Sequence, residues 1–223
     1  MQHPTSLLLD LDGTLIDSKP GIVASYNAML RGLGHVPDPD FDLTFVIGPV
    51  LEDVMGEVLT HYGDTRVEEA VAAYRRHYAE IGIFGVALYD GVEALLPALT
   101  AAGLRLFLAT SKRTVFAARI LEHLGLARYF DGIYGSEPDG SRDHKSGLIA
   151  DILRREGIRP EVSAMVGDRR YDVAGAHANR LLAIGVLWGY GDRGELERAG
   201  ADLLVSRPAE LAAMLTLQDP TGH

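Results

Sequence analysis

The feature that most constrains the fold is a regular alternation in the C-terminal half, where short apolar runs are separated by segments with helical periodicity. The runs are too short for helices and do not alternate with polar residues, which is typical of strands covered on both faces. The predicted strands are residues 5–9, 104–109, 131–134, 162–166, 181–186 and 201–205, and the predicted helices are 113–124, 145–156, 171–179 and one from Pro208. Strands and helices alternating at short spacing indicate an α/β protein with a parallel sheet.

The N-terminal strand is not followed by a second strand for a long way. Three segments with helical spacing come instead, at residues 20–33, 50–62 and 66–81. We therefore predict a helical insert at residues 16–86, set into an α/β core made of residues 1–15 and 87–223. Candidate hinges near the point of return to the core are Gly82, Gly85 and Gly91.

Composition limits the partners and the location that we expect. The chain has 223 residues with 21 Lys and Arg against 31 Asp and Glu, a formal net charge of −10. Such an acidic chain has no general attraction for nucleic acid or anionic lipid. It contains no cysteine, which excludes disulfides, thiol nucleophiles and Cys-ligated metals. With no leader pattern and no apolar run of membrane length, we expect a cytoplasmic monomer or homodimer without nucleic-acid or membrane partners.

The strongest functional signal is the segment LLLDLDGTL at residues 7–15. Its apolar strand delivers two carboxylates, Asp10 and Asp12, to the edge where open α/β sheets bind ligands. Adjacent carboxylates repel each other unless a cation holds them or one is protonated. The pair is therefore suited to a nucleophile with an acid/base partner, or to a metal site. A plain surface turn is the alternative, although turns seldom place two acids directly after a buried strand.

A second acidic motif, VGDRRYD, follows the predicted strand at 162–166 and contains Asp168 and Asp172. Asp172 falls in the first turn of the next helix, so both side chains would face one pocket. The carboxyl ends of parallel strands share one edge, so these acids are expected to meet Asp10 and Asp12 there. A cluster of carboxylate oxygens favours a hard divalent cation, and we predict Mg²⁺. The alternative is that Asp168 only caps a helix.

Two further positions carry groups that can bind phosphate. Thr110 and Ser111 follow the predicted strand at 104–109, and their hydroxyls can donate to phosphate oxygens, although such residues more often cap a helix. Lys145 opens a predicted helix, where the helix dipole disfavours a cation. A nearby dianion would explain that position, and a solvated surface lysine is the commoner alternative.

Other phosphate and metal motifs are incomplete. The segment 140–146 lacks the second glycine of a P-loop, because His144 stands in its place. A calcium loop that starts at Asp10 fails because Leu15 occupies the position of its glycine. The eight histidines do not have a zinc-ligand spacing. Residues 188–191, WGYG, fit either a mobile loop at the rim of the site or ordinary packing.

In this order, the four motifs resemble the haloacid dehalogenase (HAD) superfamily, in particular its phosphatases of the phosphoglycolate phosphatase type. The resemblance covers nearly the whole chain and includes a helical cap inserted directly after the first motif. It implies a Rossmann-like core, an all-helical cap and hydrolysis of a small phosphorylated metabolite through an aspartyl-phosphate. Asp12 argues against a dehalogenase, because dehalogenases of this superfamily lack an acid there.

The resemblance also implies a role for each site residue. Asp10 would attack phosphorus, and Asp12 would protonate the leaving oxygen and then activate the water. The phosphoryl oxygens would be held by Thr110 and Lys145, with Ser111 beside them.

The Mg²⁺ site is implied in the same way. The ion would bind the carboxylates of Asp10 and Asp168 and the backbone carbonyl of Asp12, with Asp172 in support. A carboxylate that attacks a phosphate dianion is an anion–anion encounter, so the metal and a lysine are needed to cancel charge first.

The stretch before Lys145 departs from the phosphoglycolate phosphatase pattern. No proline follows Lys145, and residues 135–145 look more like members described as 5′-nucleotidases. We expect substrate choice to lie in the insert, near Gly48, Pro49 and Arg75. A sugar phosphomutase similar to β-phosphoglucomutase and a non-catalytic module that binds phosphorylated metabolites are the competing functions.

Overall fold

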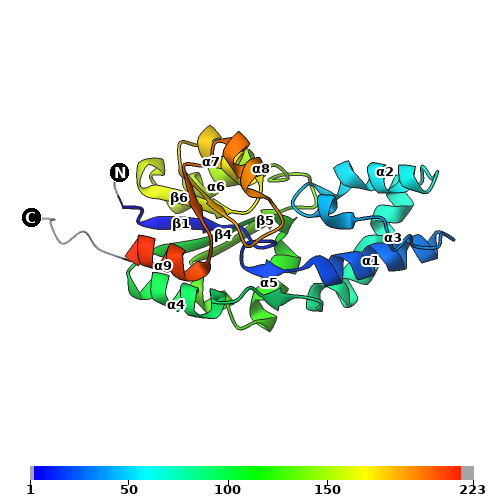
Figure 1. Cartoon of the computed structure of the whole chain (residues 1–223), viewed down its shortest axis with the longest axis horizontal. Coiled ribbons are helices and arrows are strands. Elements are labelled where there is room, and N and C mark those ends of the chain that lie inside the picture. The colour runs from blue at the N-terminus through cyan, green and yellow to red at the C-terminus, as the bar shows by residue number, and fades with distance from the viewer. Residues whose placement is uncertain (1–2, 217–223) are drawn as a thin grey trace, which may run out of the picture.

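A six-stranded sheet forms the centre of the computed structural model, which describes residues 3–216 (Figure 1). Its order is β5-β4-β1-β6-β7-β8, and every neighbouring pair is parallel. The strands are β1 (Ser6–Leu9), β4 (Arg105–Arg113), β5 (Gly132–Ser136), β6 (Ser163–Gly167), β7 (Leu182–Val186) and β8 (Leu203–Val205). The prediction of an α/β protein with a parallel sheet is confirmed.

Helices cover both faces of this sheet (Figure 1). One face carries α6 (Lys145–Glu156), α7 (Arg170–Ala178) and α8 (Arg193–Ala199), and the other carries α4 (Val92–Ala101), α5 (Thr114–His123) and α9 (Pro208–Thr216). Strand β1 serves both layers, because successive side chains of a strand point to opposite faces. Leu7 and Leu9 pack in the cluster of α4 and α5, whereas Leu8 packs in the cluster of α6 and α7.

The segment after β1 forms the helices that the sequence predicts. They are α1 (Lys19–Gly32), α2 (Leu51–His61) and α3 (Val67–Glu80), and they lie together beyond one end of the sheet (Figure 1). Short β2 (Ile16–Asp17) and β3 (Ala87–Leu88) pair antiparallel where the chain leaves and rejoins the core. This arrangement supports the proposed division into an insert at residues 16–86 and a core. Within that proposed core, residues 1–2 and 217–223 lie outside the described part.

The remaining short elements are 3₁₀ turns and connections. The turns are η1 (Leu43–Val46), η2 (Gly82–Phe84), η3 (Ala127–Tyr129) and η4 (Pro160–Val162). Among the helices described, none has the length and apolar character required to cross a bilayer.

Two helices and two strands of the fold had no counterpart in the sequence-based predictions. Helix α4 has Pro97 in its interior, which removes a backbone donor and obscures the helical pattern. Helix α8 is short, and β2 and β3 are shorter still, so that no periodicity can develop in them. Strand β4 also runs beyond the predicted end at residue 109, because it pairs again with β5 at Arg113 after an irregularity.

Two of the candidate hinge glycines have a packing role. The backbone N–H of Gly21 in α1 donates to the carbonyl of Gly85 at 2.9 Å. A Cβ on Gly82 would lie 2.3 Å from Ser25 Oγ and 2.7 Å from Tyr78 Cδ2, closer than real Cβ atoms approach. The return segment therefore touches α1 backbone to backbone, and side chains at these positions would separate the two.

Alanine substitutions at two glycines of the insert are expected to act in opposite directions. Gly82→Ala should lower the free energy of unfolding by about 1–3 kcal/mol through overpacking. Gly56→Ala, inside α2 with nothing within 4 Å of the added Cβ, should raise it by about 0.5–1 kcal/mol because alanine favours the helix. Urea denaturation of both variants measures the difference, and a Gly82→Ala protein as stable as the parent would contradict the packing role.

Candidate active site

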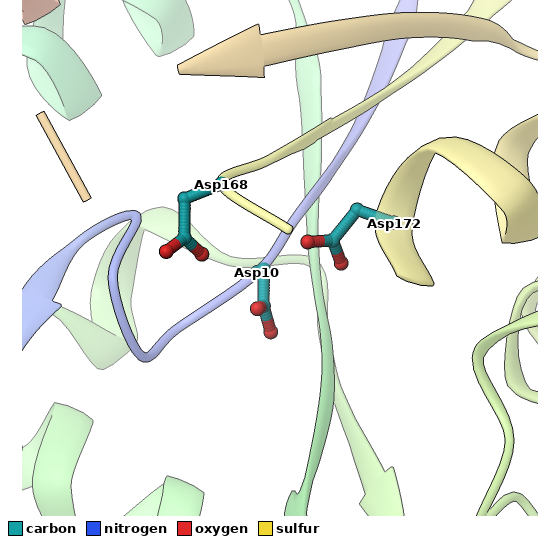
Figure 2. Close-up of side chains that lie close together, drawn as sticks. All are labelled: Asp10, Asp168 and Asp172. Atoms are coloured by element: carbon teal, nitrogen blue, oxygen red, sulfur yellow. The ribbon is translucent and has the colours of Figure 1, made fainter. Parts of the chain in front are cut away.

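Three carboxylates from distant parts of the chain converge at the carboxyl edge of the sheet (Figure 2). Asp10 directly follows β1, Asp168 directly follows β6, and Asp172 lies in the first turn of α7. One oxygen of each lies within 4.8 Å of the others, and all three side chains are buried. The predicted meeting of these acids is observed, and it follows from the parallel pairing of β1 with β6.

Glycines in both acidic motifs leave room for these carboxylates. Gly13 has a φ of 82°, and a Cβ there would lie 2.1 Å from Asp168 Oδ2. A Cβ on Gly167 would lie 2.1 Å from Asp172 Cγ. Gly13 therefore leaves room for Asp168 of the other motif, and Gly167 leaves room for Asp172 in the following helix.

Lys145 supplies a buried positive charge to this cluster. Its Nζ lies 2.8 Å from Asp10 Oδ1 and 2.8 Å from Asp172 Oδ1, and it donates to the carbonyl of Ala109 at 2.7 Å. Burial alone would lower the pKa of Lys145, but the two carboxylates more than offset this and raise the pKa above its ordinary value. The surface-lysine alternative is wrong, because this first residue of α6 is buried among acids.

The cluster holds more acidic than basic groups. Burial, opposed by Lys145 and supported by repulsion from Asp172, raises the pKa of Asp10 to about 7. Burial and repulsion from Asp172 and Asp10 hold the pKa of Asp168 well above its ordinary value. One ammonium thus faces three carboxylates in a buried space, and a divalent cation would relieve their repulsion. The donors are all carboxylate oxygens, a set that suits Mg²⁺.

The side chain of Asp12 lies outside this group. Its Oδ1 is 2.6 Å from Nζ of Lys112, which also donates to the hydroxyl of Tyr78 on α3 at 2.7 Å. Sequence reasoning missed both partners. Lys112 follows Thr110 by two residues in β4, and that spacing, which puts both side chains on one face, could have indicated it. Tyr78 carried no such signal.

Thr110 and Ser111 lie within β4 rather than at the start of α5, which begins at Thr114. The helix-cap alternative for them is therefore wrong. Thr110 is buried, and its Oγ1 accepts a hydrogen bond from the backbone N–H of Lys112 at 3.2 Å. Both residues line a cavity together with Asp10 and Asp12.

This cavity, of about 320 Å³, lies between the sheet edge and the insert. Ser111 also borders an adjoining cavity of about 390 Å³, which reaches Lys145 and Arg169. The positions that we expected to govern substrate choice all line the first cavity, namely Gly48, Pro49 and Arg75. Its other insert-derived walls are largely aromatic or aliphatic, and include Ile22, Tyr26, Val46, Ile47, Tyr74 and Tyr78.

The WGYG segment packs against the site. Trp188 Nε1 donates to the carbonyl of Thr14 at 2.9 Å, and the backbone N–H of Tyr190 donates to Asp168 Oδ2 at 2.8 Å. The Tyr190 hydroxyl accepts from the N–H of Ser18 at 2.7 Å and donates to Asp17 Oδ1 at 2.8 Å. One residue therefore joins the Asp168 carboxylate to the start of the insert.

Comparison with known proteins agrees with this geometry. The family model described as haloacid dehalogenase-like hydrolase matches residues 7–186, which include all seven predicted site residues. The chain belongs to this family. It is therefore a HAD-like hydrolase, and several of its named relatives are phosphatases.

Named relatives include a 5′-nucleotidase of Pseudomonas aeruginosa, 41% identical over 88% of this chain and 88% of its own length. A phosphoglycolate phosphatase of Neisseria gonorrhoeae is 32% identical over 86% of this chain and 84% of its own. The tyrosine-protein kinase PtkA of Mycobacterium tuberculosis is 41% identical over 85% of this chain, but over only 64% of that protein. The crystal structure of a predicted phosphatase from Clostridium acetobutylicum has a TM-score of 0.88, 38% identity and coverage of 96% and 99% of the two chains.

Removing one carboxylate of the cluster should lower the melting temperature relative to the parent when Mg²⁺ is present and raise it when Mg²⁺ is absent. Mg²⁺ in large excess is expected to raise the melting temperature of the parent by roughly 5 °C, because it binds only the folded cluster. Asp168→Asn should lose most of this shift, yet melt higher than the parent in EDTA, because one of three repelling buried acids is gone.

The matched control is Asp53→Asn, an exposed acid of α2 that lines the cavity outside the cluster. It should keep the Mg²⁺-dependent shift. Calorimetric melting with and without the ion checks all three proteins, and an unchanged shift in Asp168→Asn would contradict the assignment of the metal site.

Proposed function

We propose that this protein is a Mg²⁺-dependent phosphatase that hydrolyses a small phosphomonoester through a phosphorylated Asp10. The observation that carries the proposal is the placement of Asp10, which lines the cavity while Lys145, Asp168 and Asp172 surround it. Relatives named as phosphatases and a 5′-nucleotidase support it. When bound, Mg²⁺ would neutralise charge on the carboxylates of Asp10 and Asp168 and on the phosphoryl group.

Asp10 is the proposed nucleophile. Its carboxylate opens into the cavity at the end of a buried strand, so its position is held by the sheet rather than by a flexible loop. Its raised pKa shows that the ionised form is costly until positive charge is supplied. Lys145 already contributes one such charge at 2.8 Å, and it lines the adjoining cavity together with Ser111, where it could contact a bound phosphoryl group.

Asp12 is the proposed acid and base. It lines the same cavity as Asp10 but takes no part in the carboxylate cluster. One of its carboxylate oxygens contacts Lys112, and the other is available for proton transfer. A proton would pass to the oxygen of the leaving alcohol, and a proton of the attacking water would later return to Asp12.

The walls of the cavity favour an uncharged leaving group with a ring, such as a nucleoside. Besides Asp10 and Asp12, the lining contains Asp53 and Asp143, which have no ion-pair partner among the described residues and disfavour a second anionic group on the substrate. Tyr26 is buried in the lining, and its hydroxyl has no hydrogen-bond partner among the described residues. Its ring lies 4.7 Å from that of Tyr74, and such an aromatic wall suits a base or ribose.

Phosphoglycolate is the second candidate, and one observation favours it. Arg113 lines the cavity and has no ion-pair partner in the part of the chain that the structure describes. The lysine and the other arginine of the lining are engaged, since Lys112 contacts Asp12 and Arg75 contacts Glu52. Arg113 could pair with the carboxylate of a glycolate leaving group.

The nucleophile is tested by Asp10→Asn with p-nitrophenyl phosphate and Mg²⁺. The amide cannot form the phosphorylated intermediate, so kcat should fall by at least about 10⁴-fold. Circular dichroism should be unchanged. A folded variant that retains appreciable turnover would refute the mechanism, and a parent inactive on a broad phosphoester panel would favour the non-catalytic alternative.

The substrate class is tested by kcat/KM for nucleoside 5′-monophosphates, phosphoglycolate and sugar phosphates. We expect kcat/KM for nucleoside 5′-monophosphates to exceed that for phosphoglycolate by at least about tenfold, because each poorly matched group of a substrate costs about 1 kcal/mol or more. Arg113→Met should then affect nucleotides little. A preference for phosphoglycolate that Arg113→Met removes would establish the second candidate instead. Formation of a phosphorylated product from glucose 1-phosphate, without release of phosphate, would indicate a phosphomutase.

A further inference from the structure

Lys112 connects the insert to Asp12 through a single ammonium group. Its Nζ lies 2.6 Å from Asp12 Oδ1 and 2.7 Å from the hydroxyl of Tyr78. The side chains of Lys112 and Asp12 are only 8% and 11% exposed, so water competes little for these contacts. One partner follows β1 of the core and the other lies on α3 of the insert.

Tyr78 is held in place by aromatic neighbours on both sides of this junction. Its ring stacks on Tyr74 of α3, with centroids 5.5 Å apart, and meets Phe116 of α5 edge-on at 5.6 Å. Lys112 Nζ also lies 5.1 Å from the centre of the Tyr78 ring. The location of the hydroxyl therefore depends on how α3 sits against α5, an element of the core.

We propose that Lys112 is a positioning residue for Asp12, and that Tyr78 makes this positioning depend on the seating of α3 against the core. The inference rests on the proposed phosphatase function. The ammonium holds one carboxylate oxygen of Asp12 and leaves the other for the substrate. When α3 moves away, Lys112 loses one of its two anchors, and Asp12 loses its fixed orientation.

The proton transfers that depend on this orientation can be written in full. In the first step Asp10 forms a bond to phosphorus, the bond from phosphorus to the leaving oxygen breaks, and that oxygen takes its electron pair and the proton of Asp12. In the second step a water oxygen attacks phosphorus, its proton passes to Asp12, and the bond between Asp10 and phosphorus breaks. Lys112 gives up no proton in either step.

A different role for Lys112 makes a different prediction. If the ammonium bound the transferred phosphoryl group directly, its loss would harm all phosphomonoesters alike. If it orients the proton donor, the harm depends on how much the leaving group needs a proton. The p-nitrophenolate ion leaves readily without one, whereas the alkoxide of benzyl alcohol does not.

The experiment compares kcat/KM for benzyl phosphate and p-nitrophenyl phosphate in Lys112→Met, Lys112→Arg and Tyr78→Phe. We expect Lys112→Met to lower the value for benzyl phosphate by about 10²-fold and that for p-nitrophenyl phosphate by less than about fivefold. Tyr78→Phe, which keeps the ring and loses only the hydroxyl, should change the ratio in the same direction by about tenfold. Lys112→Arg should recover part of the loss, because it restores the charge.

Tyr74→Phe is the matched control, since it removes a hydroxyl from the same helix and the same cavity, and that hydroxyl makes no hydrogen bond to Lys112 in the described part of the chain. It should leave the ratio between the two substrates unchanged. Equal losses on both substrates, or a parent-like ratio in Tyr78→Phe, would overturn the positioning role while leaving the phosphatase intact. If the parent protein were as inactive on both probes as the Asp10→Asn variant, the phosphatase function would be overturned, and this inference with it. Should Lys112→Met fail to fold, Tyr78→Phe decides.

Discussion

The buried charge cluster around Lys145 is stable only if the strands and helices of the core are positioned accurately around it. Ionised groups removed from water are costly unless they meet opposite charge at close range, and here the ammonium contacts Asp10 and Asp172 at 2.8 Å. Those contacts require β1, the start of α6 and the start of α7 to be correctly placed together. The fully buried leucines of β1 and its register with β6, Leu9 opposite Val166, supply that placement. Apolar packing therefore positions the charges.

Under the proposed function, the chemistry and the choice of substrate arise from different parts of the molecule. Core strands present Asp10, Asp12 and Thr110 at the sheet edge, while the insert supplies most of the aromatic and aliphatic wall of the cavity. Relatives with different names are consistent with such a division, since they share the family and differ in what they are said to act on. In this chain the two parts meet at Lys112, whose ammonium contacts both.

The sequence was most informative where local rules determine the outcome. The apolar runs indicated parallel strands, and the common edge of such strands predicted that Asp168 and Asp172 meet Asp10 and Asp12. The structure groups three of these acids, whereas the side chain of Asp12 pairs with Lys112. The sequence was least informative where packing between separate elements decides. The contact of Lys112 with Tyr78 depends on how α3 sits on the core, and the tie from Tyr190 to Asp168 depends on how a loop folds back. Neither contact produces a periodic pattern or a characteristic residue spacing in the sequence.

The short pairing of β2 with β3 has a consequence for how such proteins diversify. Since Asp17 stands opposite Ala87, the outgoing and incoming strands are neighbours, and the excursion between them spans almost no distance on the core. An inserted segment of another length or composition could therefore replace this one at the β2–β3 pair without altering the strand order of the central sheet. Proteins that share this core can thus differ in the inserted segment while they keep the same carboxyl edge of the sheet.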